Sequence, residues 1–511
     1  MLAGLAASGV AAAVPVRLLR AAETLRFRTS PFTLGVASGY PGPRSIVLWT
    51  RLAPQPLAPG GGMAAEVVPV EWEIASDEAF RHIVQRGTAY AEPVWAHSVH
   101  VELTGLEPAT WYWYRFTAGG QRSVAGRTRT APAPGAEAGR LRVAVASCQQ
   151  YEHGYYVAYR HMLDDDLDLV VHVGDYIYEL SWGSNLVRHH GAPECHTLDD
   201  YRARYALYRG DRDLQAAHAA YPWMVAWDDH EVENDYANDT SEENDDPALF
   251  LARRAAAYKA YYEHMPLPRR MVPFGPNLRL HCAQAFGGLV NLLMLDERQY
   301  RSPQACPRAG RRGANRVTSN CTELFDPSRT KLGERQEQWL AAELAASKAR
   351  WTLLAQGTVM AYVDEQPGPG EQFWTDGWNG YPVARDRLLG TLATTGVANP
   401  VVLSGDIHAF LVANLNQRAA DLGSPIVASE FTTTSISSQG APQKAVDERM
   451  SSNPNLLFAS SERRGYLLLD VDNKRLQAQL VAMESVSRPE TGRSLLATFI
   501  VESGQPGPVR A

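Results

Sequence analysis

Four short blocks of this sequence carry side chains that can bind metal ions. Each follows an apolar run, and together they offer a thiol, phenols, imidazoles, carboxylates and an amide: Ser147-Cys148, Gly174-Asp175 with Tyr176 and Tyr178, Asp228-Asp229-His230 with Asn234, and Gly405-Asp406-Ile407-His408. A Gly-Asp pair is common in turns, so one block alone is a weak signal. Four such blocks in one chain are hard to explain as separate turns, and we predict that they form one metal site.

The apolar runs before these blocks are typical of β-strands. They lie at residues 141–146, 167–173, 289–295, 351–355 and 401–403, and helical stretches such as 332–346 alternate with them. This alternation predicts an α/β core from residue 140 onward. Loops at the carboxyl ends of strands form the binding crevice in α/β folds, so blocks that are distant in the sequence can converge there.

An all-β region precedes this core. Residues 31–130 contain predicted short strands at 45–50, 67–74, 97–103 and 110–117, separated by Pro and Gly. The segment 103–116 resembles fibronectin type III and immunoglobulin-like sandwiches, in which a Tyr after such a turn locks a corner. A packing module is favoured over a carbohydrate- or surface-binding module, because fold alone does not give function. A linker rich in Pro and Ala at 131–139 marks the boundary, and we expect the second domain over residues 140–490.

The composition is that of a folded globular protein. The 511 residues exceed one ordinary domain, and the proportions of hydrophobic (45%) and charged (21%) residues argue against a disordered or multi-span membrane chain. The formal net charge of −7 gives no sign of a basic nucleic-acid surface, so we expect no sequence-specific nucleic-acid binding.

The first 22 residues have the pattern of a truncated signal peptide. An apolar run at 2–16 is followed by Arg17, Arg20 and the pair Ala21-Ala22, where cleavage could occur. The run is shorter than the roughly 20 residues of a transmembrane helix, so no transmembrane anchor is expected. We expect export to the periplasm or the medium through a truncated signal of the twin-arginine type; the alternative is a cytosolic helix.

The five cysteines are compatible with export. Four of them, Cys195, Cys282, Cys306 and Cys321, form an even set that an oxidising compartment could pair. Only the pairing of Cys306 with Cys321 is suggested by proximity, and four buried free thiols are the alternative. Cys148 is the odd cysteine and invites a chemical explanation.

The order and content of the four blocks resemble the calcineurin-like metallophosphoesterases, and within them the PhoD-type alkaline phosphatases. The motifs that carry the resemblance are Ser147-Cys148-Gln149, Gly174-Asp-Tyr-Ile-Tyr178-Glu179, Trp227-Asp-Asp-His-Glu-Val-Glu-Asn234 and Ser404-Gly-Asp-Ile-His408. The resemblance implies a four-layer α/β fold with a β-sandwich flanked by helices, preceded by the small fibronectin- or immunoglobulin-like sandwich. It also implies an exported phosphomonoesterase and phosphodiesterase that releases inorganic phosphate from a phosphate ester.

The motifs depart from the general superfamily at four places. Ser147-Cys148 stands where most members have Asp-x-His, and Asp228-Asp229-His230 stands where most have Gly-Asn-His. Gly405-Asp406-Ile407-His408 replaces a Gly-His-x-His, and Gln356 stands where a His is usual.

The resemblance implies Fe³⁺ and Ca²⁺ as the metals. Cys148, Tyr178 and His408 suit iron, and Asp175 would bridge it to calcium. The oxygen ligands that calcium prefers would come from Asp229, Asn234, Gln356 and Asp406, with the choice between Asp229 and Asn234 left open. A similar Gly-Asp-x-x-Tyr spacing in purple acid phosphatases favours Tyr178 over Tyr176.

Two further residues are candidates for the reaction itself. His230 could contact the phosphate or protonate the leaving group, or it could only hydrogen-bond a carboxylate. Arg188 could clamp phosphate oxygens, or it could be an exposed loop residue. An aromatic segment with Trp374, Trp378 and Tyr381 could form a wall of the pocket, although ordinary packing explains it equally well.

Two other functions are compatible with the sequence. One is a phosphodiesterase of the phospholipase type, which would need a longer groove. The other is a surface-binding protein whose metal cluster is structural. A structural site would be closed by protein ligands, whereas His230 beside the cluster favours catalysis.

Overall fold

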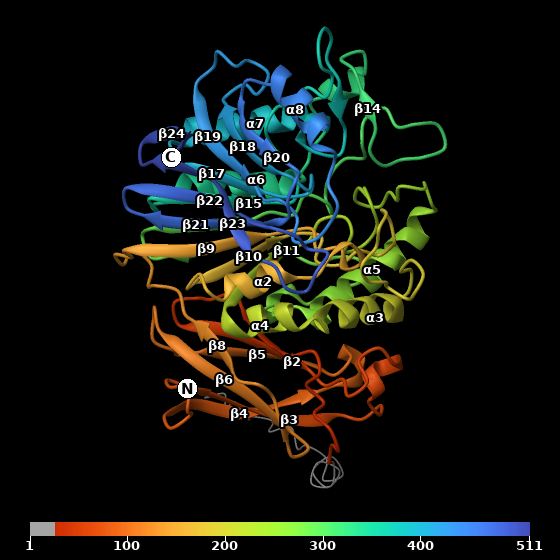
Figure 1. Ribbon diagram of the computed structural model, residues 1–511, viewed down its shortest axis with the longest axis vertical. Helices are drawn as coiled ribbons and strands as arrows, with labels where there is room; N and C mark the ends of the chain where they lie inside the picture. The colour runs from red at the N-terminus through yellow and green to blue at the C-terminus, as the bar shows by residue number, and fades with distance from the viewer. Residues whose placement is uncertain (1–25) are drawn as a thin grey trace, which may run out of the picture.

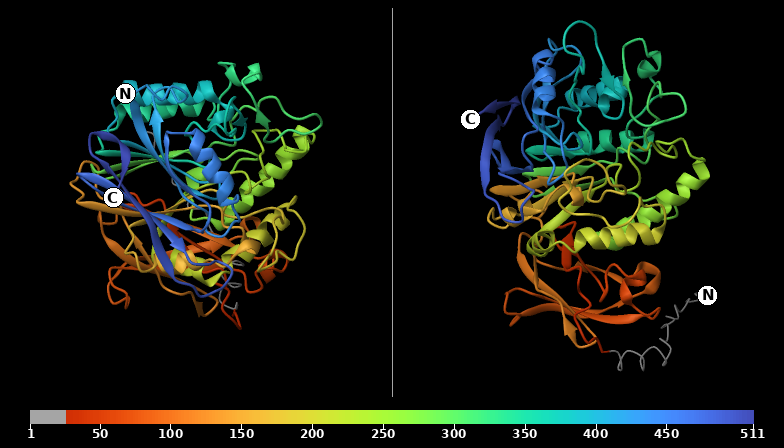
Figure 2. Two further views of the ribbon diagram at one scale, coloured as in Figure 1. Left: turned by 45° about the horizontal axis from the view of Figure 1, so that its top comes forward. Right: turned by 45° about the vertical axis from the view of Figure 1, so that its right-hand side comes forward.

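The computed structural model describes residues 26–511, so the predicted signal segment 1–22 lies outside the described residues. Two large sheets are stacked in the upper two thirds of the molecule, with helices outside them, and a smaller β-layer lies below (Figure 1). The two further views show the same order of layers (Figure 2). The predicted α/β architecture, with two sheets between helices, is confirmed.

The larger sheet has ten strands. Its order is β24 (Gln505–Arg510), β23 (Arg493–Glu502), β22 (Arg475–Met483), β21 (Gly465–Asp472), β9 (Arg140–Ala146), β10 (Leu169–Val173), β11 (Pro222–Ala226), β1 (Val36–Gly39), β2 (Ser45–Arg51) and β5 (Ser98–Thr104). Strands β9, β10 and β11 are parallel, with His172 opposite Ala146 on one side and Val225 on the other. Their carboxyl ends therefore meet at one edge.

The second sheet has seven strands. Its order is β12 (Cys282–Phe286), β13 (Val290–Met294), β15 (Trp351–Ala355), β17 (Pro400–Ser404), β19 (Ile426–Thr432), β18 (Phe410–Asn416) and β20 (Leu456–Ser460). Strands β13, β15, β17 and β19 are parallel. Every residue of β10, β11, β15 and β17 is buried, as expected for parallel strands covered on both faces. One hydrophobic cluster includes Val143 and Val171 of the first sheet with Leu353 and Leu403 of the second, so the core lies between the sheets.

Helices cover the outer faces. They are α2 (Val157–Met162), α3 (Leu198–Arg209), α4 (Arg212–Ala220), α5 (Pro247–His264), α6 (Glu334–Ala346), α7 (Pro382–Thr395) and α8 (Gln443–Ser452), with short 3-10 turns η1 (Pro59–Gly62), η2 (Pro93–Trp95), η3 (Tyr151–His153), η4 (Arg269–Met271), η5 (Thr322–Phe325) and η6 (Trp378–Gly380). Local caps begin several of them: Thr197 and Asp200 form a capping box on α3, and Asp211 caps α4. None of the helices within residues 26–511 has the length and apolar character needed to cross a membrane.

The N-terminal β-region shares a sheet with the core. A five-stranded sheet is built from β4 (Ile83–Ala91), β3 (Val68–Ala75), β6 (Trp111–Ala118), β7 (Gln121–Arg122) and β8 (Gly126–Arg129), and it packs against the β1, β2 and β5 end of the larger sheet. Because β1 pairs in parallel with β11 through Ser38 and Pro222, the sheet runs across the predicted boundary at 131–139. The predicted tyrosine corner is present: the Tyr112 hydroxyl accepts a hydrogen bond from the Glu107 amide at 2.9 Å.

Candidate metal centre

All four predicted blocks lie just after the carboxyl ends of strands in the two sheets. Cys148 follows β9, Asp175 follows β10, Asp229 follows β11 and Asp406 follows β17. Three of these residues have a left-handed backbone, with φ of 57° at Cys148, 58° at Asp175 and 65° at Asp406. Non-glycine residues rarely adopt this conformation, and when they do they are concentrated at functional sites. The chain therefore turns sharply after each strand, which places the side chain at the crevice.

Cys148, Asp175 and His408 form the first group of possible ligands. Each offers one ligand atom, and the three atoms lie within 4.8 Å of one another. The Tyr178 hydroxyl joins this group, because it donates to Asp175 Oδ2 at 2.9 Å and lies 3.0 Å from His408 Nε2. The hydroxyl of Tyr176 instead lies 2.8 Å from His218 Nε2. The structure thus brings Tyr178, and not Tyr176, into the cluster.

The imidazole of His408 is arranged as a neutral acceptor. Its Nδ1–H donates to the Gln439 carbonyl at 2.6 Å, which leaves the Nε2 lone pair facing the cluster. Burial, helped by Arg464, lowers the pKa of His408 to about 3. A neutral ring whose second nitrogen is held by a carbonyl is the usual state of a metal-binding histidine.

Asp175 also belongs to a second group. A carboxylate oxygen of Asp175, one of Asp229 and a ring nitrogen of His230 lie within 4.8 Å of one another. Asn234 and Asp406 line the same cavity as these residues. Asp175 therefore lies between the thiol and phenol side and the carboxylate side, where the sequence predicted a bridging ligand.

Gln356, like Cys148 and Tyr178, does not line this cavity. It directly follows β15 and is fully buried, and its Nε2 donates to the Thr358 carbonyl at 2.9 Å. Its Oε1 is buried without a hydrogen-bond donor, as is Oδ1 of Asp175. Buried acceptors without donors are costly unless a cation fills their place, so these two oxygens fit a site for hard metal ions.

The electrostatics of the cluster favour a bound cation. Burial raises the pKa of Asp175 well above its ordinary value, and Asp229 and Asp228 raise it further. Burial together with Asp228 does the same to Asp406, and burial with Asp175 raises the pKa of the Cys148 thiol. Such groups stay ionised in a buried site only beside a strong positive charge, which a metal ion supplies.

His230 lies beside the cluster and is held by Glu179. Its Nδ1–H donates to Glu179 Oε2 at 2.7 Å, and its ring lies 4.1 Å from the ring of Tyr178 between centroids. Burial lowers the pKa of His230, but the carboxylates of Glu179, Asp229 and Asp175 outweigh burial and raise it well above its ordinary value. A protonated imidazole that lines the cavity can donate a proton to a bound ester.

Two carboxylates fix the loops that carry these groups. Glu231 accepts hydrogen bonds from the amides of Asp175 (3.2 Å), Tyr176 (2.6 Å) and Asp228 (2.8 Å), so it ties the loop after β10 to the loop after β11. Glu179 makes a second link, because its Oε1 accepts from the Asn234 amide at 2.8 Å.

Gly174 makes close contact between these loops possible. Its φ is 117°, and a Cβ atom there would lie 2.6 Å from the Asp228 amide nitrogen, so no other residue fits.

The predicted role of Arg188 is wrong. Its guanidinium donates to the Tyr151 carbonyl at 2.9 Å and to Asp211 Oδ2 at 2.7 Å, and it lies 3.8 Å from the centroid of the Tyr151 ring. The side chain is 11% exposed, so it is not an exposed loop residue either. All of its donors face protein groups, and Arg188 does not line the cavity in front of the cluster.

Three other arginines line that cavity. It has a volume of about 540 Å³, and Arg308, Arg311 and Arg312 line it together with Asp175, Asp229 and Asp406. These arginines belong to a loop that the Cys306–Cys321 disulfide closes, as the spacing of these cysteines suggested. The other cysteines, Cys148, Cys195 and Cys282, are free.

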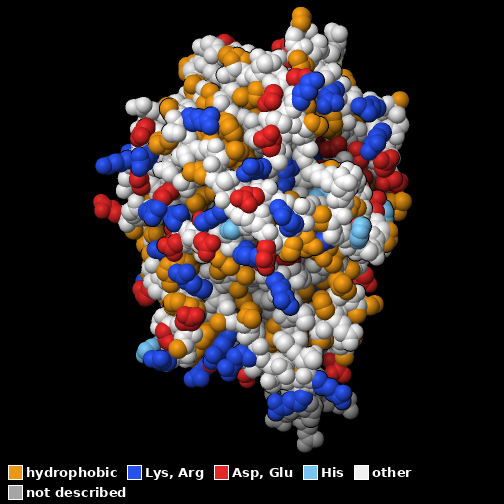
Figure 3. Space-filling model, viewed as in Figure 1, with side chains coloured by type: hydrophobic (Ala, Val, Ile, Leu, Met, Phe, Trp, Pro, Cys, Tyr) orange, Lys and Arg blue, Asp and Glu red, His pale blue; other side chains and the backbone are white. Residues whose placement is uncertain are grey.

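Figure 3 shows acidic and basic side chains interspersed over the visible face, with no extended field of one sign.

Of the aromatic segment, Trp374 lines the cavity, but Trp378 and Tyr381 are buried in the core.

Sequence reasoning also missed a buried ion cluster behind the carboxylates. Arg298 bonds Asp228 and lies 3.5 Å from Asp229 Oδ1, and its Nη1 donates to Asp376 Oδ1 at 3.0 Å. Burial raises the pKa of Asp376, but Arg298, Arg301 and Lys331 outweigh it and hold the pKa well below its ordinary value. Arg298 lies three residues after the predicted strand 289–295. A search for charged side chains just after the carboxyl ends of strands would have found it.

Comparison with known proteins gives consistent matches. The sequence matches the PhoD-like phosphatase family over residues 143–480 and the N-terminal domain of that family over residues 19–132. Alkaline phosphatase D of Bacillus subtilis (strain 168) is 46% identical over an alignment of 491 residues that covers 94% of this chain and 82% of that protein. A solved structure of PhoD has a TM-score of 0.90 at 45% identity and covers 95% of this chain and 93% of its own. Purple acid phosphatase PPD1 from yellow lupin shares the fold, with a TM-score of 0.54 at 12% identity over 91% of this chain and 74% of its own.

Proposed function

The chain belongs to the PhoD-like phosphatase family, and from this premise we propose how its buried cluster hydrolyses phosphate esters. The chain is a metal-dependent phosphoric ester hydrolase with phosphatase and phosphodiesterase activity, as its 46% identity to alkaline phosphatase D indicates. The observation that carries the proposal is the position of Asp175, whose carboxylate takes part in two groups of ligand atoms that each lie within 4.8 Å.

The ligands divide by chemical type into an iron side and a calcium side. Cys148, Tyr178 and His408 would hold Fe³⁺, because their thiolate, phenolate and imidazole groups suit iron. Asp175 would be shared with Ca²⁺. The calcium ligands would be oxygen donors, namely Asp229, Asn234, Gln356 and Asp406. Asp229 and Asn234 are both kept as proposed calcium ligands. They differ in that Asp229 Oδ1 also lies 3.5 Å from the Arg298 guanidinium.

The bound metals would neutralise the phosphate and lower the pKa of a water so that hydroxide attacks phosphorus at ordinary pH. The chain's own residues would do the rest. His230, held in its charged state by Glu179, donates its proton to the leaving-group oxygen. Arg308, Arg311 and Arg312, which line the same cavity, bind the phosphate oxygens in place of Arg188. Arg311 also pairs with Glu242 at 2.6 Å.

The cavity argues for catalysis over a purely structural metal site. A structural site is closed by protein ligands on every side. Here a cavity of about 540 Å³ opens in front of Asp175, Asp229 and His408, which leaves room for a substrate. The proposal includes export to the periplasm or the medium, which the signal-like pattern of residues 1–22 supports. It also includes inorganic phosphate as the product and no sequence-specific nucleic-acid binding.

Metal removal and a matched pair of tyrosine variants test the proposal. Purified enzyme should contain iron and calcium, and EDTA should abolish hydrolysis of p-nitrophenyl phosphate and bis-p-nitrophenyl phosphate until both metals are restored. Tyr178→Phe should lose visible absorbance and most of its activity. Tyr176→Phe is the control, because its hydroxyl contacts His218 and not the cluster, and it should keep both. Zinc alone in active enzyme, or equal behaviour of the two variants, would show that the ligand assignment is wrong.

A further inference from the structure

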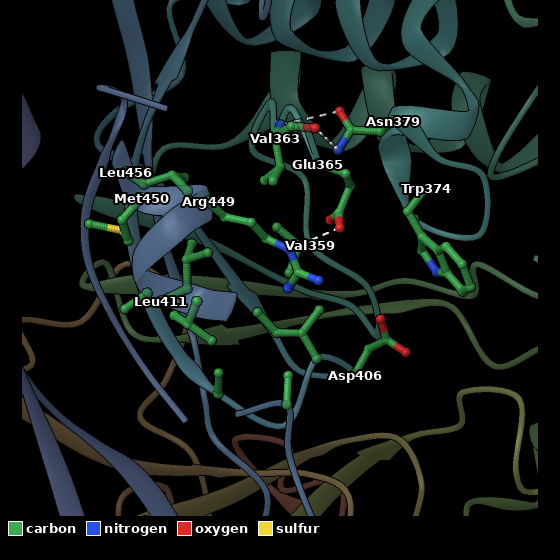
Figure 4. Close-up of a pocket in the computed structure, with 16 residues that line it drawn as sticks. Val359, Val363, Glu365, Trp374, Asn379, Asp406, Leu411, Arg449, Met450 and Leu456 are labelled. Carbon is green, nitrogen blue, oxygen red and sulfur yellow. Dashed lines mark hydrogen bonds and ion pairs between the residues drawn. The ribbon is translucent and has the colours of Figure 1, made fainter. Parts of the chain in front are cut away.

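A second, smaller cavity adjoins the one in front of the cluster. Its volume is about 80 Å³. Figure 4 shows Asp406 and Trp374 on one side of it, and Leu411, Met450 and Leu456 on the other. The apolar wall comes from β18, β20 and α8, three elements that have no part in the metal cluster.

The two cavities share a wall. Asp406 and Trp374 line both of them. Between two proposed metal ligands, Ile407 lines only the small cavity, while His408 lines only the large one. The two cavities therefore meet at Asp406 and Trp374, next to the proposed metal site.

The small cavity has the character of a site for an uncharged group. Its one ion pair is internal, because Arg449 Nε lies 2.9 Å from Glu365 Oε2 (Figure 4). Arg449 is the single cation among its lining residues, whereas three arginines line the large cavity, so the small cavity is less suited to a phosphate group. Ile407 is 37% exposed although it lies beside the buried cluster, so apolar surface is available next to the metal site.

We propose that this cavity binds an apolar organic group of the phosphate ester, and so makes the enzyme favour esters of alkyl or aryl alcohols. The inference rests on the proposed function, since it places the phosphate at the cluster. Each methylene that leaves water for an apolar cavity gains about 0.8 kcal/mol, which corresponds to about fourfold in binding.

A chain-length series of substrates tests the proposal. With metal-loaded enzyme, kcat/KM should rise about fourfold per methylene from ethyl to propyl to butyl phosphate and level off once the cavity is full. From ethanol upward these alcohols have similar acidity, so the leaving-group chemistry stays nearly constant. The n-alkylphosphonates, which cannot be hydrolysed, should inhibit more strongly along the same series, and this measurement needs no variant.

A variant that fills the cavity provides the second arm. Ala441 lines the cavity from a loop, and Ala441→Leu should flatten the dependence on chain length for substrates and inhibitors. The control is Ala342→Leu on the exposed side of α6, which should keep the wild-type slope. Ethyl phosphate turnover without any chain-length trend would refute the cavity's role while the proposed function stands. Absence of hydrolysis of every ester would refute both.

Discussion

The disulfide between Cys306 and Cys321 should hold the arginine loop closed over the metal site. The two cysteines are 15 residues apart, and the loop between them carries Arg308, Arg311 and Arg312. The loop is also held by a two-residue pairing of β14 (Arg316–Val317) with β16 (Phe373–Trp374) and by an ion pair of Arg311 with Glu242. Its amides add hydrogen bonds from Ala314 to Asp235 at 2.9 Å and from Asn315 to Thr375 at 2.8 Å. The disulfide is the covalent restraint among these contacts.

The chain entropy of the opened loop sets the size of the effect. Closing a loop of about 15 residues is worth about 3 kcal/mol, which is roughly 100-fold in the equilibrium between the closed and the opened loop. In the double variant Cys306→Ser with Cys321→Ser, the loop should therefore open about 100 times more often.

Limited trypsin digestion measures this opening, because the four arginines of the loop, Arg308, Arg311, Arg312 and Arg316, are cleavage sites. When opening is fast compared with cleavage, the cleavage rate follows the population of the open loop, so it should rise about 100-fold, with fragments assigned by mass spectrometry. A reductant should give the wild type the same sensitivity and leave the variant unchanged. The control Cys282→Ser removes a free cysteine and should respond to reductant as the wild type does. A rise of less than about threefold in the double variant would refute the reasoning and assign the closure to the non-covalent contacts of the loop.

Four further predictions concern the site and its support. His230→Ala should lower kcat by about 100-fold or more, the usual effect of losing a general acid, with the iron and calcium content unchanged by elemental analysis. Cys148→Ser should lose most of its iron and activity while its circular dichroism stays close to wild type; normal iron content would exclude the thiolate ligand. Asp376→Asn leaves buried guanidinium groups without their carboxylate and should lower the free energy of unfolding in urea by about 3 kcal/mol or more; a loss under 1 kcal/mol would contradict this. Burial, with Arg301, lowers the pKa of Lys331 to about 8 in the folded chain. The unfolded chain therefore binds this proton more tightly, and folding becomes more favourable as the proton is lost. In urea titrations, the free energy of unfolding of the wild type should rise relative to that of Lys331→Met between about pH 8 and about pH 10.

Much of the architecture could be predicted because its signals are local. Buried parallel strands are continuous apolar runs, so the runs at 141–146 and 351–355 matched β9 and β15 closely. The side chains that follow such strands meet at the edge of the sheets, which is why the blocks around Asp175 and Asp406 could be grouped before their distances were known. The helices α3 to α5 were missed, because their apolar faces are short and interrupted by charged residues.

The amino-acid sequence by itself determined the strands, the chemical types at their ends and the family resemblance, since each depends on residues that are neighbours in the chain. Only the tertiary structure decided which side chains share a space. Arg188 packs on Tyr151 and pairs with Asp211, whereas Arg298 reaches Asp228 from the loop after β13 of the other sheet. The pairing of β1 with β11, which joins the N-terminal strands to the larger sheet, is of the same kind. Such contacts depend on the packing of elements tens to hundreds of residues apart, and no local pattern specifies which charged group meets which partner.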